Sequence, residues 1–173
     1  MHWKYNPAGE PSSGAIDVIR AALAEISAAS GVEMIEDGDT SIDVSDPNQA
    51  DPQIAEGEVV IGFAPPGSPA IQPSEYYADK FVWGSAHVLS QGPDIGQGSV
   101  ALNHETAMML PLDFSSSASL GAVVLHETGH IVGLQHVAPS TQIMVAVAGH
   151  SHEHLGTGDL AGLATLKDRP CEN

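Results

Sequence analysis

The segment LGAVVLHETGHIVGLQH, residues 120–136, carries the pattern from which the rest of the chain can be interpreted. Its first part is apolar at the density of a buried helix, and a run of serines at 115–117 precedes it. We therefore predict a helix over residues 120–132. Gly133 can adopt the left-handed backbone that ends a helix, so the chain can then turn back toward the helix that it has just left.

Three histidines in this segment have the spacing of a metal site. His126 and His130 are four residues apart, so they project from one helical face and can reach one zinc ion at about 2.0–2.1 Å. The turn at Gly133 brings His136 to the third position. Three neutral imidazoles with an open fourth position are typical of catalytic zinc, whereas structural zinc has four protein ligands. We predict a zinc site at these three histidines.

Glu127 lies one residue after the first predicted ligand. Its carboxylate is expected beside the metal, where it can accept a proton from a water molecule and act as a general base. Two histidines and a glutamate at this spacing occur by chance in many helices, but the glycine and third histidine make five specified positions in an eleven-residue window. A buried core is a poor alternative, because it would desolvate three histidines and a carboxylate.

The composition limits the partners of the chain. Its 173 residues contain 5 Lys and Arg against 22 Asp and Glu, which gives a formal net charge of −17. This balance excludes a general nucleic-acid binder, since phosphate neutralisation needs a basic face, and it favours a monomer through self-repulsion. No run of apolar residues approaches the ~20 needed to span a membrane. The length suits a single domain over residues 1–173.

Shorter patterns outside the central segment predict the other elements. Four isoleucines and leucines at steps of three and four form one stripe of a helix over residues 13–29. A last helix begins near Thr157 and ends before Pro170. The single cysteine, Cys171, permits no internal disulfide and no thiolate zinc site. Strands are expected at residues 3–5, 32–35, 41–44, 58–64, 83–89 and 98–103.

With these motifs the chain resembles the metzincin zinc peptidases. Their signature comprises the same helix, glycine and third histidine, followed by a methionine turn to which Gln142-Ile143-Met144 is similar. The resemblance implies that Met144 lies beneath the zinc. It extends over nearly the whole chain and is closest to the matrixins, including small bacterial members. No tyrosine follows the methionine, so the resemblance implies that Glu127 and zinc act without one.

The resemblance also implies an architecture. We expect an α/β (α+β) fold with a twisted mixed five-stranded sheet packed on two long helices, and a small C-terminal subdomain that carries the Met turn and the last helix. The subdomains would span about residues 1–135 and 136–173. In the resembled family an extended protein or peptide substrate lies along an antiparallel edge strand. The corresponding residues here are Gly84, Ser85, Ala86, His87 and Val88.

The expected activity is that of a zinc-dependent endopeptidase. The alternative is a non-catalytic zinc-binding interaction module, an inactive relative of the peptidases. In such a module a fourth protein ligand would close the zinc site, and the candidates are His150, His152 and His154. An open position on the metal would favour the peptidase.

Three weaker metal signals each have a structural alternative. Calcium is the second candidate cofactor, because the acidic loop 36–51 offers carboxylates, although the EF-hand spacing is absent and a solvated loop is the alternative. The histidines at 150, 152 and 154 could form a second metal clamp or an exposed polar loop. His104 could share a metal with His87 or simply end a strand. The candidate calcium ligands are Asp37, Asp39, Asp43 and Asp46.

The resemblance implies an extracellular setting. The first residues, Met1–Pro7, lack the apolar core of a secretory signal. A cytosolic protein and a secreted protein whose signal has been removed both stay open.

Overall fold

The computed structural model describes residues 1–72, 82–89, 97–146 and 152–167. The strands are β1 His2–Asn6, β2 Ile35–Asp39, β3 Glu58–Ala64, β4 Gly84–Val88 and β5 Gly98–Asn103. The helices are α1 Ala15–Ser30, α2 Pro47–Ala50, α3 His104–Ala107, α4 Leu120–Ile131 and α5 Thr157–Lys167, with a 3₁₀ turn, η1, at Asp51–Gln53.

The five strands form one mixed sheet in the order β2-β1-β3-β5-β4. The first four strands in this order run parallel, and β4 pairs antiparallel with β5 at the edge. Every residue of β3 and β5 is buried, which explains the nearly continuous apolar runs at both places in the sequence. The predicted mixed five-stranded sheet is confirmed, with β4 as its antiparallel edge.

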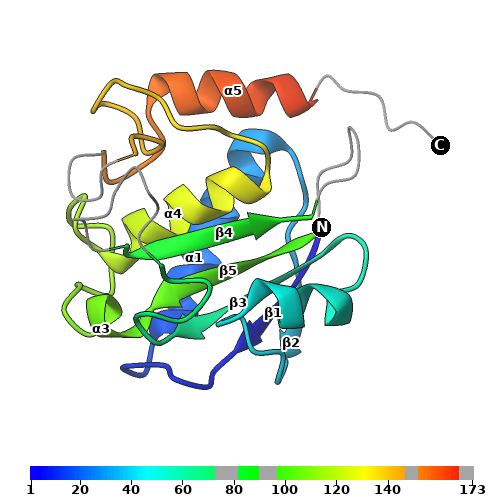
Figure 1. Cartoon of the computed structure of the whole chain (residues 1–173). Coiled ribbons are helices and arrows are strands. Elements are labelled where there is room, and N and C mark those ends of the chain that lie inside the picture. Colours follow the sequence, from blue (N-terminus) through cyan, green and yellow to red (C-terminus); the bar gives the residue numbers. More distant parts are fainter. Residues whose placement is uncertain (73–81, 90–96, 147–151, 168–173) are drawn as a thin grey trace.

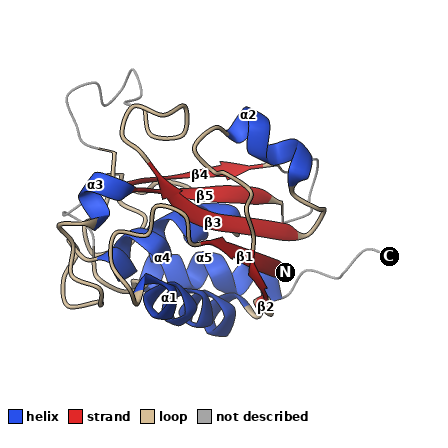
Figure 2. Ribbon diagram, turned by 90° about the horizontal axis from the view of Figure 1, so that it is seen from below, coloured by secondary structure: helices blue, strands red, loops and turns tan. Residues whose placement is uncertain are grey.

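The helices α1, α4 and α5 lie together on one side of the sheet, and α2 lies on the other (Figures 1 and 2). The apolar stripe of α1 is buried: Ile19 and Ile26 have no exposed surface, and Leu23 packs in the same cluster. This stripe and α4 form the main core with β1, β3 and β5. A smaller core under α2 includes Val44, Ile54 and Val60. The sheet and α1 thus hold α4, which carries His126 and His130, in a fixed position.

The prediction of the second strand was wrong in position. Residues 32–35 were expected to form it because they leave the first long helix, but β2 spans Ile35–Asp39 and pairs parallel with β1. Four of its five residues are exposed, so its position depends on backbone pairing at the sheet edge and leaves little apolar pattern to recognise. Residues 41–44 form no strand; Val44 is buried in the smaller core from a loop.

Within the described residues, no helix combines the length and the apolar character that a membrane crossing requires. The predicted boundary between two subdomains near residue 135 stays a prediction.

Candidate metal centre

The helix α4 is held at both ends by features of its own sequence. At its start, the hydroxyl of Ser119 accepts the N–H of Ala122 and donates to the carbonyl of Ser116. At its end, Gly133 has a φ of +96°, and the N–H of Leu134 donates to the carbonyl of Gly129 at 2.9 Å. The predicted left-handed turn is confirmed, and it reverses the chain directly after the second histidine.

The reversal brings the three predicted histidines together. The Nε2 atom of His136 lies 3.1 Å from the Nε2 atoms of both His126 and His130. The Nδ1 atom of His126 donates to the carbonyl of Ile143 and that of His130 to the carbonyl of Leu134, both at 2.8 Å. These bonds leave the Nε2 lone pairs of His126 and His130 facing the common centre, as in a metal site whose ligands are oriented by backbone carbonyls.

The electrostatic environment keeps the three imidazoles neutral. Burial lowers the pKa of His126 to about 4, and the positive forms of the two neighbouring histidines oppose its protonation further. Burial also lowers the pKa values of His130 and His136. Neutral imidazole is the form that binds a metal ion, so the site is prepared for a cation at neutral pH.

The side chain of Glu127 extends from α4 to the edge strand β4. The residue is 7% exposed, and its side chain occupies the space beside Gly84, where an added Cβ would come within 2.9 Å of the Glu127 Cγ. The carboxylate accepts the backbone N–H of Ala86. Burial raises the pKa of Glu127 to about 8, against the opposing effect of that hydrogen bond. A carboxyl group with such a pKa can both take up and release a proton near neutral pH.

Met144 lies under α4 and is 1% exposed. Gly129 lies between His126 and His130 in the sequence, and a Cβ added there would come within 2.6 Å of the sulfur of Met144. Only glycine therefore fits at this position without moving the methionine. The carbonyl of Met144 also accepts the N–H of Val137, the residue after His136. The predicted methionine turn therefore packs directly against the segment that holds the histidines.

A buried pair, Gln142 and Asp159, fixes this turn and was not predicted from the sequence. The Oδ2 atom of Asp159 accepts the N–H groups of Ile143 at 2.7 Å and Gly156 at 2.8 Å. In return, Oε1 of Gln142 accepts the N–H groups of Gly158 and Asp159 at the start of α5. Sixteen or seventeen residues separate the main partners, so no local motif indicates the contact.

The other predicted metal ligands have separate partners. His87 pairs with Asp51 rather than with His104, whose Nδ1 donates to the carbonyl of Gly9. His154 pairs with Glu25, and His150 lies outside the described residues.

Three candidate calcium ligands of the acidic loop also have partners within the protein. Asp37 pairs with His2, Asp43 accepts the N–H of Ser45, and Asp46 caps α2. The calcium prediction is not tested by these contacts.

Comparison with known proteins identifies the family. The matrixin family profile matches residues 17–167, which is most of the chain. The chain belongs to the matrixin family. The match includes α4, the three histidines, Met144 and α5, so the resemblance in the sequence is confirmed. No curated protein matches the sequence.

The donor set of this matrixin fits zinc. Three imidazole nitrogens lie within 4.8 Å of one another, and neutral imidazole is a ligand that zinc prefers. Across the residues that the structure describes, no fourth His, Cys, Asp or Glu side chain joins the three. Membership of the matrixins and this cluster together point to a zinc metallopeptidase.

Proposed function

We propose that this matrixin is a zinc-dependent endopeptidase in which His126, His130 and His136 hold the metal and Glu127 is the general base. The observation that carries the proposal is the position of Glu127. Its carboxylate follows the first metal-binding histidine on α4 and touches the edge strand at Gly84 and Ala86. A buried carboxylate has little structural value in this position, because its desolvation is costly, and it has the properties that proton transfer requires.

The chain's own groups divide the work of peptide hydrolysis. Zinc, when bound, supplies Lewis acidity that makes water more acidic and polarises a carbonyl group. Glu127 accepts the proton of the attacking water on its carboxylate and returns it to the nitrogen of the leaving amine. The carbonyls of Ile143 and Leu134 hold the rings of His126 and His130 in the orientation and tautomer that the site needs.

The edge strand β4 is the proposed binding site for an extended protein or peptide substrate. It pairs with β5 on one side only in the described sheet, and its Ala86 N–H points to Glu127. A peptide that adds to this edge as a further strand would align its backbone by main-chain hydrogen bonds and pass beside Glu127. The proposed contact residues remain Gly84, Ser85, Ala86, His87 and Val88.

The non-catalytic zinc module makes a different prediction for the fourth ligand position. Two of its candidate ligands, His152 and His154, are described, and neither joins the three clustered histidines. This placement supports the peptidase.

We also propose that the protein acts as a monomer outside the cell. Matrixins are commonly extracellular, and a net charge of −17 opposes self-association. Sedimentation velocity at low salt tests the monomer, and assay of the culture medium against the cell fraction tests secretion.

Incubation of the zinc-loaded protein with a diverse peptide library tests the proposed activity. We expect cleavage that stops when a chelator removes the metal and returns when zinc is added back. The cleavage sites also give the side-chain preference. A protein that binds one zinc per chain and cuts no peptide would contradict the peptidase and support the non-catalytic module.

A further inference from the structure

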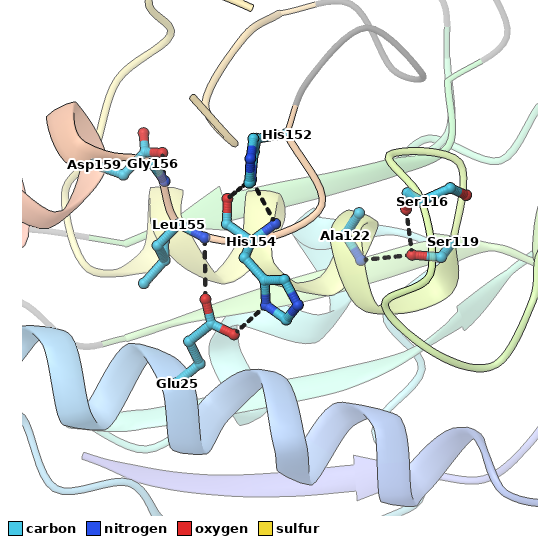
Figure 3. A network of polar contacts seen from close by, with 9 residues as sticks. All are labelled: Glu25, Ser116, Ser119, Ala122, His152, His154, Leu155, Gly156 and Asp159. Atoms are coloured by element: carbon cyan, nitrogen blue, oxygen red, sulfur yellow. Dashed lines mark hydrogen bonds and ion pairs between the residues drawn. The ribbon is translucent and has the colours of Figure 1, made fainter. Parts of the chain in front are cut away.

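Glu25 of α1 holds the segment that leads into α5. Its Oε1 atom accepts the N–H of Leu155 at 3.0 Å, and its Oε2 atom lies 2.8 Å from Nδ1 of His154 (Figure 3). The two partners are 129 and 130 residues away in the sequence. One carboxylate of the N-terminal helix thus fixes two successive residues near the other end of the chain.

His154 extends this contact to the start of α4. Its ring stacks on Phe114, with centroids 5.3 Å apart and planes inclined by 12°. The ring of Phe114 in turn occupies the place where a side chain at Gly121, in the first turn of α4, would project. His154 therefore lies between Glu25 on one helix and an aromatic ring packed on the helix that carries His126 and His130.

A second route runs from the same segment to His126. Leu155 is buried in the main core, and the next residue, Gly156, donates its N–H to Asp159. The same carboxylate oxygen of Asp159 accepts the N–H of Ile143, whose carbonyl accepts Nδ1 of His126. Each step is a hydrogen bond of 2.7–3.0 Å or a covalent link between neighbouring residues.

We propose that Glu25, through His154 and Leu155, is a positioning residue for the metal centre. It fixes the segment 152–156, this segment fixes Asp159 and Ile143, and the carbonyl of Ile143 orients the ring of His126. Loss of the Glu25 carboxylate releases the segment and lets this carbonyl move. Loss of a direct orienting partner weakens metal binding by about 10- to 100-fold. For Glu25, which acts through intermediate residues, we expect the Kd for zinc to rise by about threefold to tenfold.

The inference rests on the proposed zinc site, and competition of the whole protein with a chromophoric zinc chelator tests it. The variants are Glu25→Ala, which removes both contacts, and Glu25→Gln, which keeps an oxygen for Leu155 and a polar group for His154. Asp17→Ala is the matched control. It also removes a carboxylate from α1, but Asp17 is exposed, and among the described residues its side chain pairs only with Arg20, which keeps its two bonds to Glu36.

We expect a weaker zinc affinity in Glu25→Ala, an affinity closer to that of the wild type in Glu25→Gln, and no change in Asp17→Ala. Urea unfolding of the metal-free variants separates this role from a structural one, which would lower the unfolding midpoint and leave the Kd of the folded protein unchanged. An unchanged Kd in folded Glu25→Ala would overturn the inference.

His154→Ala gives an independent result if Glu25→Ala does not fold. It removes the ring but keeps the bond from Leu155 to Glu25, so we expect a smaller rise in Kd, and an unchanged Kd would again contradict the inference. A wild-type protein that binds no zinc would contradict the proposed function itself. That result is distinct from a wild type that binds zinc with variants that bind it equally well.

Discussion

The strands β2 and β4 form the two edges of the sheet, and they differ in the charge and exposure of their side chains. The edge strand β2 reads Ile-Glu-Asp-Gly-Asp, and its residues are mostly exposed. The edge strand β4 reads Gly-Ser-Ala-His-Val, contains no carboxylate and is mostly half-buried against α4 and β5. The acidic side chains of β2 repel a further strand, which is a common protection of sheet edges. The edge that lacks this protection is the one that adjoins Glu127.

The two glutamates beside these edges differ in the same way. Glu36 of β2 is exposed, and two hydrogen bonds from Arg20 hold its pKa below the ordinary value. Glu127 beside β4 is buried, and its pKa rises to about 8. Carboxylates therefore stabilise one edge as charged groups, whereas the other edge holds a carboxyl group that can exchange its proton near neutral pH.

Among the substitutions in the two edge strands, the largest expected effect comes from a proline in β4. The N–H of Ala86 donates to Glu127, so Ala86→Pro removes that donor, leaves the backbone bonds from β4 to β5 in place and hinders the addition of a substrate strand. We expect kcat/KM for peptide cleavage to fall by about a hundredfold, near the lower end of what a general base contributes. Ala86→Ser keeps the N–H and is the control. Equal activity in both variants would show that substrate does not use this edge.

The stability of the metal-free protein should depend on pH in opposite directions at the two edges. Glu127 has a raised pKa, so its contribution to the free energy of unfolding is fully present below pH 4.5 and is lost as the pH rises through about 8. Glu36 has a lowered pKa, so its contribution is present above pH 4.5 and is lost in acid. Urea unfolding of wild type and Glu127→Gln isolates the first effect, because the histidines titrate in both proteins. From pH 5 to pH 9 we expect the wild type to lose on the order of 3 kcal/mol relative to the variant. Parallel pH profiles of the two proteins would contradict the burial of the carboxylate.

A methyl group at Gly129 should disturb the packing of α4 on Met144. In Gly129→Ala the new carbon meets the sulfur of Met144, and we expect a loss of about 2 kcal/mol in the free energy of unfolding. A second substitution, Met144→Ala, provides space for that carbon. In a double-mutant cycle we therefore expect Gly129→Ala to cost less when Met144→Ala is present. Costs that simply add would mean that the two residues do not touch.

The smallest effect is expected at the protected edge. Replacement of Glu36, Asp37 and Asp39 by threonine removes the charges of β2 and its exposed ion pairs with Arg20 and His2. We expect a change in unfolding free energy below about 1 kcal/mol and unchanged peptide cleavage. Self-association measured by sedimentation velocity should increase, because the edge becomes a template for another strand. A triple variant that stays monomeric would show that these charges do not protect the edge.

The sequence was most informative where the local pattern and the tertiary structure agree. The strand at 98–103 and the helix start at Leu120 were predicted at the residues where they occur, because apolar runs between turn residues reflect burial directly. The three histidines were predicted as a group because their spacing reports helical geometry and the turn at Gly133. Edge strand β2 was misplaced, since its position depends on pairing with β1 and its side chains face solvent.

Contacts between distant segments left no pattern to recognise. The bonds from Asp159 to Ile143 and from Glu25 to Leu155 join residues that come together only after the sheet and helices have packed. From the sequence, Asp159 could be placed only in the first turn of the last helix, and its bond to Ile143 could not be predicted. Hydrophobic periodicity describes which face of an element is buried, and it carries no information about which polar side chains meet across two elements.

We propose above that Glu127 transfers protons beside a zinc ion held by three histidines. The most direct test of this proposal is peptide cleavage by Glu127→Gln, with the zinc content of the same samples measured in parallel and with the exposed Glu105→Gln of α3 as the control. We predict one zinc per chain in all three proteins, cleavage by the wild type and the control, and a loss of at least about a hundredfold in kcat for Glu127→Gln. Cleavage by zinc-loaded Glu127→Gln at a rate close to that of the wild type would show that Glu127 is not the general base.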